Sequence, residues 1–471
     1  VASAYAALGL EPGDAVGILM SNSTEMLMAM LGAVCGGYVA VPLNVSVADA
    51  DIANMLTDCD ARLLVASGSH VARLESMRAK LPAETRERLV AVGDAPPGWL
   101  DFNELLLRAS ADFRFARPQP DSPCNIIYSS GTTDVPKGIV HSHACRIAWA
   151  YDLSVALRYF PGARTLITLG LFSNISWVML LNSMLCGGTI VLQPGFSPAD
   201  CLSAIGSHAI THVSMVPVML DRLIADGDLE EHDLTSLKSL MCCGSPLNPA
   251  LKLRAIEDLT PNLIELYGLT EGLITIQEPA DAKRYPESVG RPAPGQDVRI
   301  IDAGGTPVDA GETGEVVGFG RLLMSGYLNR PEASEAATWI DPDGRRWLRT
   351  GDIGHVDLHG NLYIVDRKKD MIISGGQNVY PADIEAILSE HPVVDDVAVI
   401  GVRSERWGET PLAVVVANGD VDEQTLVDWT NARVGKQQRI RGVRRLDALP
   451  RNPNGKVLKR ELRQQFADVS Y

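Results

Sequence analysis

Several features that are absent from the sequence narrow its class. No two of the eight cysteines form a Cys-X-X-Cys pair, and a chain of 471 residues can bury a large core without disulfides, so we expect reduced thiols and a cytoplasmic protein. Because the sequence starts at Val1 without a signal-peptide pattern, we expect no signal peptide. Because residues 1–8 already have an amphipathic helical pattern, we expect the chain to begin within a longer protein. Acidic residues outnumber basic ones by 58 to 42, giving a net charge of −16, which argues against general nucleic-acid binding.

One long uncharged segment needs an explanation other than a membrane span. Residues 165–199 contain no charged side chain and are long enough to cross a bilayer. Serine, asparagine, glycine and proline interrupt the segment, however. We therefore expect no membrane span, and instead a buried segment that lines an apolar pocket.

Short apolar strands alternate with helical patterns over the first three quarters of the chain. This alternation predicts parallel sheets covered by helices. Strands are expected at 15–19, 38–43, 61–66, 189–192 and 211–216, and helices at 25–35 and 199–206.

The residue composition and the predicted secondary structure change twice toward the end of the chain. Glycine and proline become frequent over 288–360, which predicts a small β-rich subdomain with strands at 297–302 and 314–319. Residues 369–471 predict a compact α+β unit with helices at 381–391 and 421–434. The predicted fold class is therefore α/β, with a large N-terminal domain (1–368) joined by a hinge to a small α+β C-terminal domain (369–471).

A glycine-rich loop follows the apolar residues Ile126 and Ile127. Its candidate anion-binding residues are Ser129, Ser130, Gly131, Thr132, Thr133 and Lys137. Small residues let backbone N–H groups converge on an anion, hydroxyls add donors, and a lysine can neutralise a phosphate oxygen. The loop is not a Walker A sequence, because Gly138 follows the lysine where serine or threonine is required. An ordinary polar loop is the alternative explanation.

The segment Tyr-Ser-Ser-Gly-Thr-Thr-X-X-Pro-Lys-Gly resembles the phosphate loop of the adenylate-forming superfamily. That superfamily comprises acyl- and aryl-CoA synthetases, the adenylation domains of nonribosomal peptide synthetases, and firefly-type luciferases. Asp134 stands where its members usually carry glycine, and slower adenylation or a shifted loop are the consequences that we consider.

Further segments resemble the other motifs of the superfamily, in the same order. They are Cys-Gly-Ser-Pro-Leu at 243–247, Tyr-Gly-Leu-Thr-Glu at 267–271, Arg-Thr-Gly-Asp at 349–352, the hinge segment 364–372, the Gly-Gly loop at 374–381 and the C-terminal loop at 450–456. In isolation each is an unremarkable turn or polar loop, whereas the ordered series covers almost the whole chain.

The resemblance implies a role for each matching residue. It assigns ATP and AMP to Ser129, Ser130, Gly131, Thr132, Thr133, Lys137, Gly244, Ser245, Pro246, Tyr267, Gly268, Thr270, Asp352 and Arg367. It implies that Lys456, Thr270 and Lys137 act in catalysis, that Glu271 and Thr132 bind Mg²⁺, and that Lys369 is the hinge residue. It assigns coenzyme A to Ser374, Gly375, Gly376, Trp407 and Arg439, the last of which lies in a basic tail at residues 431–464.

The acyl pocket differs from the usual pattern of the superfamily. Ser173 or Asn174 stands where many relatives carry a gating histidine. No buried cation is evident to pair with a second carboxylate, and no aspartate is evident to bind an amino group. An aromatic or medium-chain acid is therefore favoured over dicarboxylic and amino acids. The candidate pocket residues, for which core packing is the alternative, are Phe172, Ser173, Asn174, Trp177, Val216 and Gly244.

The resemblance implies an AMP-forming acid–thiol ligase. Such an enzyme uses ATP and Mg²⁺ to convert a carboxylic acid to an acyl-adenylate with release of pyrophosphate, and then transfers the acyl group to coenzyme A. One alternative is a stand-alone enzyme that loads the pantetheine arm of a carrier protein. Another is a nucleotide-binding relative that has lost catalysis. A homodimer is left open by the resemblance.

Overall fold

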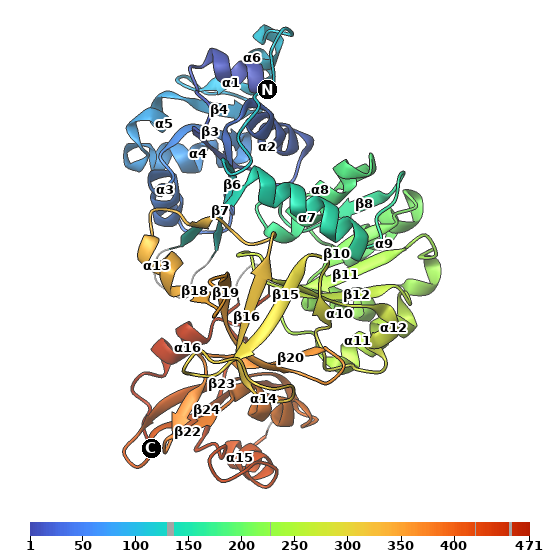
Figure 1. Ribbon diagram of the computed structural model, residues 1–471, viewed down its shortest axis with the longest axis vertical. Coiled ribbons are helices and arrows are strands. Elements are labelled where there is room, and N and C mark those ends of the chain that lie inside the picture. The colour runs from blue at the N-terminus through green and yellow to red at the C-terminus, as the bar shows by residue number, and fades with distance from the viewer. Residues whose placement is uncertain (130–135, 227, 420, 452–454) are drawn as a thin grey trace. The chain divides into compact units, whose positions relative to one another are not determined.

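The computed structural model describes residues 1–129, 136–226, 228–419, 421–451 and 455–471 (Figure 1). The chain divides into two compact units, which are described separately. The first unit comprises Val1–Asp297 and Gly318–Leu348, and the second comprises Val298–Val317 and Arg349–Tyr471. The sequence predicts a boundary near residue 368 instead. The observed division falls earlier because strand β19 (Arg346–Val356) pairs with β20 (Leu362–Arg367), which keeps residues 349–367 together.

The first sheet of the first unit has eight strands in the order β17-β7-β6-β2-β1-β3-β4-β5. Strand β1 is parallel to both of its neighbours, and all of its residues are buried, as expected for a strand in a sheet covered on both faces. The strands are β1 (Ala15–Leu19), β2 (Val39–Pro42), β3 (Ala61–Ser67), β4 (Leu89–Val92), β5 (Leu100–Asp101), β6 (Pro123–Ser129), β7 (Lys137–Ser142) and β17 (Gly326–Tyr327).

The second sheet of this unit has seven strands in the order β14-β13-β12-β11-β10-β8-β9. Strands β8 to β12 run parallel, whereas β13 is antiparallel to β12. The strands are β8 (Arg164–Ile167), β9 (Thr189–Leu192), β10 (His212–Met215), β11 (Ser239–Cys243), β12 (Leu263–Gly268), β13 (Ile274–Gln277) and β14 (Arg291–Pro292).

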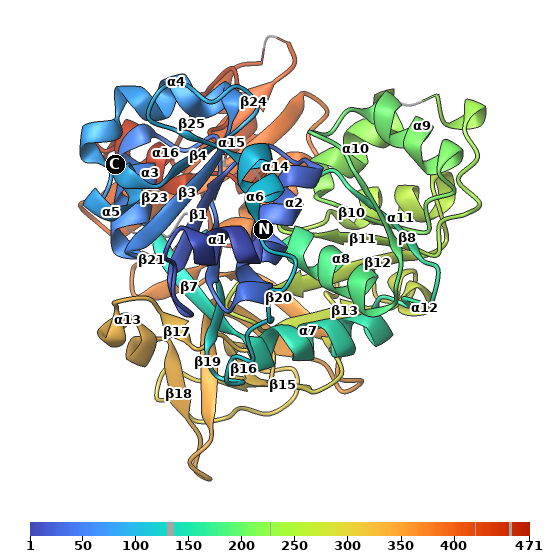
Figure 2. The ribbon, with the colours of Figure 1, turned by 90° about the horizontal axis from the view of Figure 1, so that it is seen from above.

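Helices α7 (His143–Ala156) and α8 (Asn174–Leu185) lie side by side in the first unit (Figures 1 and 2). Each begins after a serine whose hydroxyl accepts an N–H of the first turn, from Cys145 to Ser142 and from Ile175 to Ser173. The other helices of the unit are α1 (Ala2–Ala7), α2 (Thr24–Gly36), α3 (Asp49–Asp58), α4 (Gly68–Ser76), α5 (Ala83–Glu87), α6 (Phe102–Arg108), α9 (Pro198–Ser207), α10 (Pro217–Asp226), α11 (Pro249–Asp258), α12 (Pro279–Ala282) and α13 (Pro331–Ala336), with 3-10 turns at Arg78–Lys80 and Leu229–Glu231.

The predicted β-rich region forms a sheet in the order β15-β16-β19-β18, with β20 paired to β19. Its other strands are β15 (Gln296–Ile301), β16 (Gly314–Gly320) and β18 (Thr338–Ile340). The sequence places strands at 297–302 and 314–319, so both are confirmed within a residue.

The C-terminal part of the second unit has its own sheet, in the order β22-β21-β24-β23, with β25 paired to β24. Two clusters of buried apolar side chains pack against it. Its elements are β21 (Ile372–Ser374), β22 (Gln377–Val379), α14 (Pro381–Ser389), β23 (Val394–Ser404), β24 (Gly408–Ala417), α15 (Glu423–Asn431), β25 (Val443–Arg445) and α16 (Lys459–Gln465).

The uncharged segment 165–199 is divided between β8, α8, β9 and the start of α9. Its longest helix, α8, has 12 residues, and eight of them are buried. Within the described ranges, no helix is both long and apolar enough to cross a bilayer.

Candidate active site

The phosphate-loop segment connects two antiparallel strands. Strand β6 ends at Ser129 and β7 begins at Lys137, and these two residues are partners in the register of the pair. The ends of the loop are therefore held beside each other. The predicted residues Ser130, Gly131, Thr132 and Thr133, and also Asp134, lie outside the described residues.

Lys137, Tyr327 and Glu271 form a cluster at this end of β7. The Lys137 ammonium lies over the Tyr327 ring, 5.0 Å from its centroid, and the Tyr327 hydroxyl donates to Glu271 Oε1 at 2.8 Å. Burial, and then the Glu271 carboxylate, raise the pKa of Tyr327, so the hydroxyl keeps its proton and remains a donor. A cation and an oriented carboxylate are thus available for a phosphate and its metal ion.

The ends of β11 and β12 meet at one edge of the second sheet, because the strands are parallel and Cys243 is the partner of Leu266. Gly244 follows β11 with φ +95°, and a Cβ there would lie 3.2 Å from both Ile175 Cδ1 and Val216 Cγ1. A bare backbone is therefore needed where these side chains approach. The remaining motif residues on these strand ends are exposed or half-buried, which leaves them accessible to a ligand: Ser245, Pro246, Tyr267, Gly268 and Thr270.

A buried ion pair supports strand β12 below the motif that begins at Tyr267. Lys252 Nζ lies 2.5 Å from Glu265 Oε2, and the two side chains are 1% and 6% exposed. The ammonium also donates to Gln277 Oε1 at 2.7 Å and to the Pro286 carbonyl at 2.6 Å. These bonds compensate the buried charge and fix the strand that carries the motif.

Asp352, Arg367 and Lys456 come together within the second unit. Asp352 and Arg367 are register partners on β19 and β20, and Arg367 Nε lies 2.6 Å from Asp352 Oδ1. Burial lowers the pKa of Lys456 to about 8, with further lowering by Arg367 and an opposing effect of Asp352. The lysine is therefore within electrostatic reach of the two residues that the sequence assigns to the nucleotide.

The hinge segment continues directly from β20. Lys369, the predicted hinge residue, is exposed. It stands next to Asp370, which is tied to Arg463 by a 2.7 Å ion pair. Arg463 also lies in the second unit, on α16, so the hinge segment is joined to the helix that follows Lys456.

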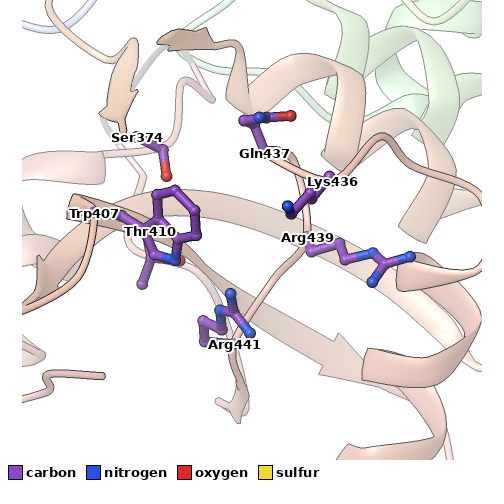
Figure 3. A pocket seen from close by; sticks show the side chains of 7 residues that line it. All are labelled: Ser374, Trp407, Thr410, Lys436, Gln437, Arg439 and Arg441. Atoms are coloured by element: carbon purple, nitrogen blue, oxygen red, sulfur yellow. The ribbon is translucent and has the colours of Figure 1, made fainter. Parts of the chain in front are cut away.

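A basic pocket lies in the C-terminal part of the second unit (Figure 3). Figure 3 shows Ser374 and Trp407 on one side, with Lys436 and Arg439 across from them. The lining residues are Ser374, Trp407, Thr410, Lys436, Gln437, Arg439 and Arg441. Cations beside an aromatic ring suit a phosphorylated nucleotide. Three of the residues that the sequence assigns to coenzyme A, Ser374, Trp407 and Arg439, are thus brought together.

The other two coenzyme A candidates form the turn between β21 and β22. Gly375 and Gly376 have φ of +60° and +79°, the left-handed region that glycine adopts most easily. The Gly375 N–H donates to the Trp407 carbonyl at 2.8 Å, and a Cβ on Gly375 would lie 2.6 Å from Trp407 Cε3. The turn therefore packs closely against the indole.

The predicted acyl-pocket residues gather around the start of α8. Phe172 is half-buried and Trp177 is 1% exposed. Ser173 caps the helix, and the Asn174 Oδ1 accepts a hydrogen bond from Arg146 Nη1 at 2.8 Å. Ile175, on the same turn of α8, approaches Gly244 together with Val216, so the predicted residues lie near one another.

A buried cation that is not evident from the sequence lies beside one of the predicted pocket residues. Arg146 is only 3% exposed and contacts Asn174 directly. Its position was missed because it lies on α7, outside the uncharged segment 165–199. The sequence of a helix that carries a single arginine does not show that the arginine faces the interior of the protein.

The chain matches the pattern of the AMP-binding enzymes over residues 1–328, and that of the C-terminal domain of the same enzymes over residues 383–456. The chain belongs to the AMP-binding enzyme family. The first match includes the phosphate loop and the motifs at 243–247 and 267–271, and the second includes the C-terminal loop up to Lys456, whereas the three motifs within 349–381 lie between the two matches. The predicted superfamily and its α/β fold class are confirmed.

The relatives of this AMP-binding enzyme include acid–CoA ligases, and also a fatty acid–[acyl-carrier-protein] ligase of Streptomyces coeruleorubidus, which is 32% identical over 99% of this chain and 89% of the relative. The chain is 36% identical to indoleacetate–CoA ligase of Aromatoleum aromaticum over 482 residues, covering 100% of this chain and 92% of the relative. It is 34% identical to the long-chain-fatty-acid–CoA ligase FadD13 of Mycobacterium tuberculosis, covering 99% and 91%. Among solved structures, the o-succinylbenzoate–CoA synthetase of Bacillus subtilis in complex with its acyl-adenylate intermediate superposes with a TM-score of 0.86 at 30% identity, covering 98% and 90%. The protein is thus an ATP-dependent, AMP-forming acid–CoA ligase.

Proposed function

We propose that this ligase activates an aromatic or medium-chain carboxylic acid, and that the residues assembled above perform the reaction. We base the roles of these residues on one observation: Lys456 lies near Asp352 and Arg367 in the second unit. It supports a site in which a lysine acts next to the nucleotide. The apolar side chains of the buried cluster that contains Trp177 support the class of acid, and Arg146 is the charged group beside that ring.

In the first step the acid carboxylate attacks the α-phosphorus of ATP, and pyrophosphate leaves. Both reactants are anionic, so positive charge has to be supplied by the protein. We propose that Lys137 neutralises the phosphates and that Lys456 stabilises the transition state, while Asp352 holds the ribose hydroxyls. Thr270 would donate to the α-phosphate.

The residues present fit a magnesium ion, which supplies charge neutralisation at the phosphates when it is bound. The Glu271 carboxylate is the hard oxygen donor that Mg²⁺ prefers, and Tyr327 holds one of its oxygens in place. Within the described ranges, no group of three or more potential metal-ligating His, Cys, Asp or Glu side chains occurs. Glu271 would therefore share the ion with phosphate oxygens and water. Thr132, the other metal candidate, lies outside the described residues.

In the second step the coenzyme A thiol attacks the acyl-adenylate carbonyl, and AMP leaves. We propose that the basic pocket of Lys436, Arg439 and Arg441 binds the phosphates of coenzyme A and that Trp407 stacks on its base. The Gly375–Gly376 turn would let the thin pantetheine arm pass. A rotation about Lys369 would exchange Lys456 for this turn between the two steps.

The experiment that tests the assignment has two stages. ATP–pyrophosphate exchange is first measured with aromatic and aliphatic acids, and exchange with at least one acid is expected. Acyl transfer is then measured to coenzyme A, free pantetheine and a pantetheinylated carrier protein. Preference for coenzyme A supports the proposal, preference for the carrier favours the carrier-loading alternative, and no exchange with any acid indicates a relative that has lost catalysis.

We also propose a cytoplasmic location, because the substrates ATP and coenzyme A are present there and all eight cysteines, each within the described residues, are free thiols. A homodimer and the absence of a nucleic-acid partner stay predictions. Gel filtration with light scattering measures the former.

A further inference from the structure

Arg146 is a buried cation in the middle of the first unit. It lies on α7 and donates from Nε to Asn125 Oδ1 at 2.7 Å and from Nη1 to Asn174 Oδ1 at 2.8 Å. Its Nη2 lies 3.2 Å from His141 Nδ1. The guanidinium carbon is 5.0 Å from the centroid of the Trp177 ring. The partners come from β6, β7 and α8, so four elements converge on one charged group.

No acidic side chain in the described part of the protein forms an ion pair with Arg146. Buried arginines are usually compensated by a carboxylate or another anion, because an unpaired charge in a low-dielectric interior is costly. The neighbouring thiols do not supply one: burial raises the pKa of Cys124 to about 12 and also raises that of Cys145, so both are neutral at pH 7. Among the described residues, therefore, no anion compensates the positive charge of the guanidinium.

His141 does not supply the missing anion or an additional proton. Its Nε2 lies 2.8 Å from the Thr270 carbonyl, an acceptor only, so Nε2 carries the hydrogen and Nδ1 accepts from Arg146. Burial, and then Arg146, lower the pKa of His141, which agrees with this neutral form. The histidine thus links the arginine to the motif residue Thr270 and leaves its charge unchanged.

The polar groups around Arg146 contain more donors than acceptors. Three of the five guanidinium N–H groups have the partners given above, and the other two have no acceptor among the described residues. The indole Nε1–H of Trp177 has no partner within the described residues, and neither has the amide nitrogen of Asn125. Trp177 is 1% exposed and Asn125 is fully buried. Buried donors without acceptors are rare in folded proteins and point to a ligand that supplies oxygen.

These donors adjoin the proposed acyl pocket. Asn174 and Trp177 are on the first two turns of α8, and between them Ile175 reaches the backbone of Gly244, with 3.2 Å between its Cδ1 and a Cβ placed there. An acid bound against Gly244 therefore lies on the helix that carries two contacts of Arg146. This is the reason to connect the unpaired charge with the substrate.

We propose that Arg146 determines specificity by binding a second oxygen acceptor of the acid, most strongly a second carboxylate, together with the indole N–H of Trp177. The proposal rests on the acid-activating function above and narrows its substrate class. It replaces the expectation that a dicarboxylic acid lacks a partner in this protein. The acids it favours are aliphatic or aromatic acids that carry a distal carboxylate.

The test compares matched acids on the wild-type enzyme and on Arg146→Met. The pairs are adipate with hexanoate and 4-carboxycinnamate with 4-methylcinnamate, and both kcat/KM for pyrophosphate exchange and the Kd of the acid by calorimetry are measured. We expect the wild type to prefer the distal carboxylate, and the variant to lose roughly 10- to 100-fold on that member alone, the loss typical of a charge-assisted hydrogen bond. Trp177→Phe, which removes only the N–H donor, should show a smaller loss of the same selectivity.

A matched control is Arg108→Met, since Arg108 is 78% exposed and forms only a surface pair with Glu104. Its selectivity should equal that of the wild type. The proposal is wrong if Arg146→Met weakens the use of both acids in each pair equally, or if the wild type prefers the apolar acid. In either case the arginine only holds Asn174 in position. If Arg146→Met does not fold, the same comparison is made with Arg146→Lys, which keeps a cation. If no acid supports exchange, the ligase assignment fails, while the calorimetric comparison still decides the role of Arg146.

Discussion

The hydroxyl of Tyr327 donates a 2.8 Å hydrogen bond to Glu271 Oε1, while its ring lies under the ammonium of Lys137. Tyr327 therefore orients both the Glu271 carboxylate, which we assign to Mg²⁺, and the Lys137 ammonium, which we assign to the phosphates of ATP. Because the carboxylate has a second oxygen left for a metal ion, Tyr327 acts as a positioning residue for Mg²⁺.

Tyr327→Phe should weaken the use of Mg²⁺ without altering the acid site. Loss of the hydrogen bond lets Glu271 rotate, and second-layer contacts of this kind are typically worth about 10- to 100-fold in metal affinity. We expect the Mg²⁺ concentration for half-maximal exchange to rise by about tenfold, with the KM of the acid unchanged. Tyr363→Phe is the control, because Tyr363 also donates to a carboxylate, Asp357, in a surface turn. Equal effects in both variants would contradict the role.

Lys456 should make adenylation sensitive to alkaline pH. The folded protein holds the pKa of Lys456 at about 8, below its ordinary 10.5, so the side chain is protonated at pH 7 and loses its charge as the pH rises through 8. If the charged form is active, pyrophosphate exchange should fall about tenfold per pH unit above 8. Lys456→Arg should extend the plateau to higher pH, since arginine does not deprotonate there. An unchanged profile in that variant would assign the titration to another group.

Lys456→Ala should separate the two half-reactions. We expect exchange to be abolished, whereas thioester formation from a supplied acyl-adenylate should persist, because the lysine is assigned only to the attack on ATP. The measurement is acyl-CoA formation from synthetic acyl-AMP, with the wild type as reference. Equal loss of both activities would count against the assigned role.

The basic pocket should bind coenzyme A through charge. Arg439→Met and Lys436→Met should each raise the KM of coenzyme A by about tenfold and leave pyrophosphate exchange unchanged, as expected for loss of one phosphate contact. The effect should shrink at high ionic strength and with dephospho-coenzyme A, if the contacted group is the 3′-phosphate. Arg433→Met is the control, because Arg433 stacks on Trp429 and does not line the pocket. A similar loss in that variant would indicate a general effect of tail charge.

Most of the scaffold was predictable from local sequence patterns. The strands expected at 15–19 and 189–192 are β1 and β9 with the same bounds, because continuous apolar runs between turns mark strands of a parallel sheet. Strand β1 is fully buried, whereas β9, at the end of its sheet, is half-buried or exposed. The helix expected at 381–391 is α14, which begins at Pro381 and ends two residues early. Helix α7, which carries Arg146, was not predicted. The motifs likewise lie on contiguous segments and could be found by order and spacing alone.

The residues missed by sequence analysis act through partners far along the chain. Arg146 meets Asn174 across 28 residues, and Tyr327 meets Glu271 across 56. Neither contact has a local signature, since an arginine on an amphipathic helix and a tyrosine beside a glycine are common on protein surfaces. Only the packing of α7 on α8 and of β17 on β7 turns these side chains inward.

The Gly375–Gly376 turn offers the most direct test of the second half-reaction, because its two glycines differ in surroundings. Both have positive φ, so alanine at either position costs about 1 kcal/mol of backbone strain. Only at Gly375 would the new methyl group also meet Trp407, at 2.6 Å, whereas nothing lies within 4 Å at Gly376. Gly375→Ala should therefore displace the indole and lower kcat/KM for coenzyme A by about tenfold more than Gly376→Ala does, with pyrophosphate exchange retained in both. The part of the tryptophan fluorescence that is lost in Trp407→Phe, which keeps the other six tryptophans, reports the displacement independently of activity. Equal thioesterification rates in the two variants would show that the indole does not shape the path of the thiol.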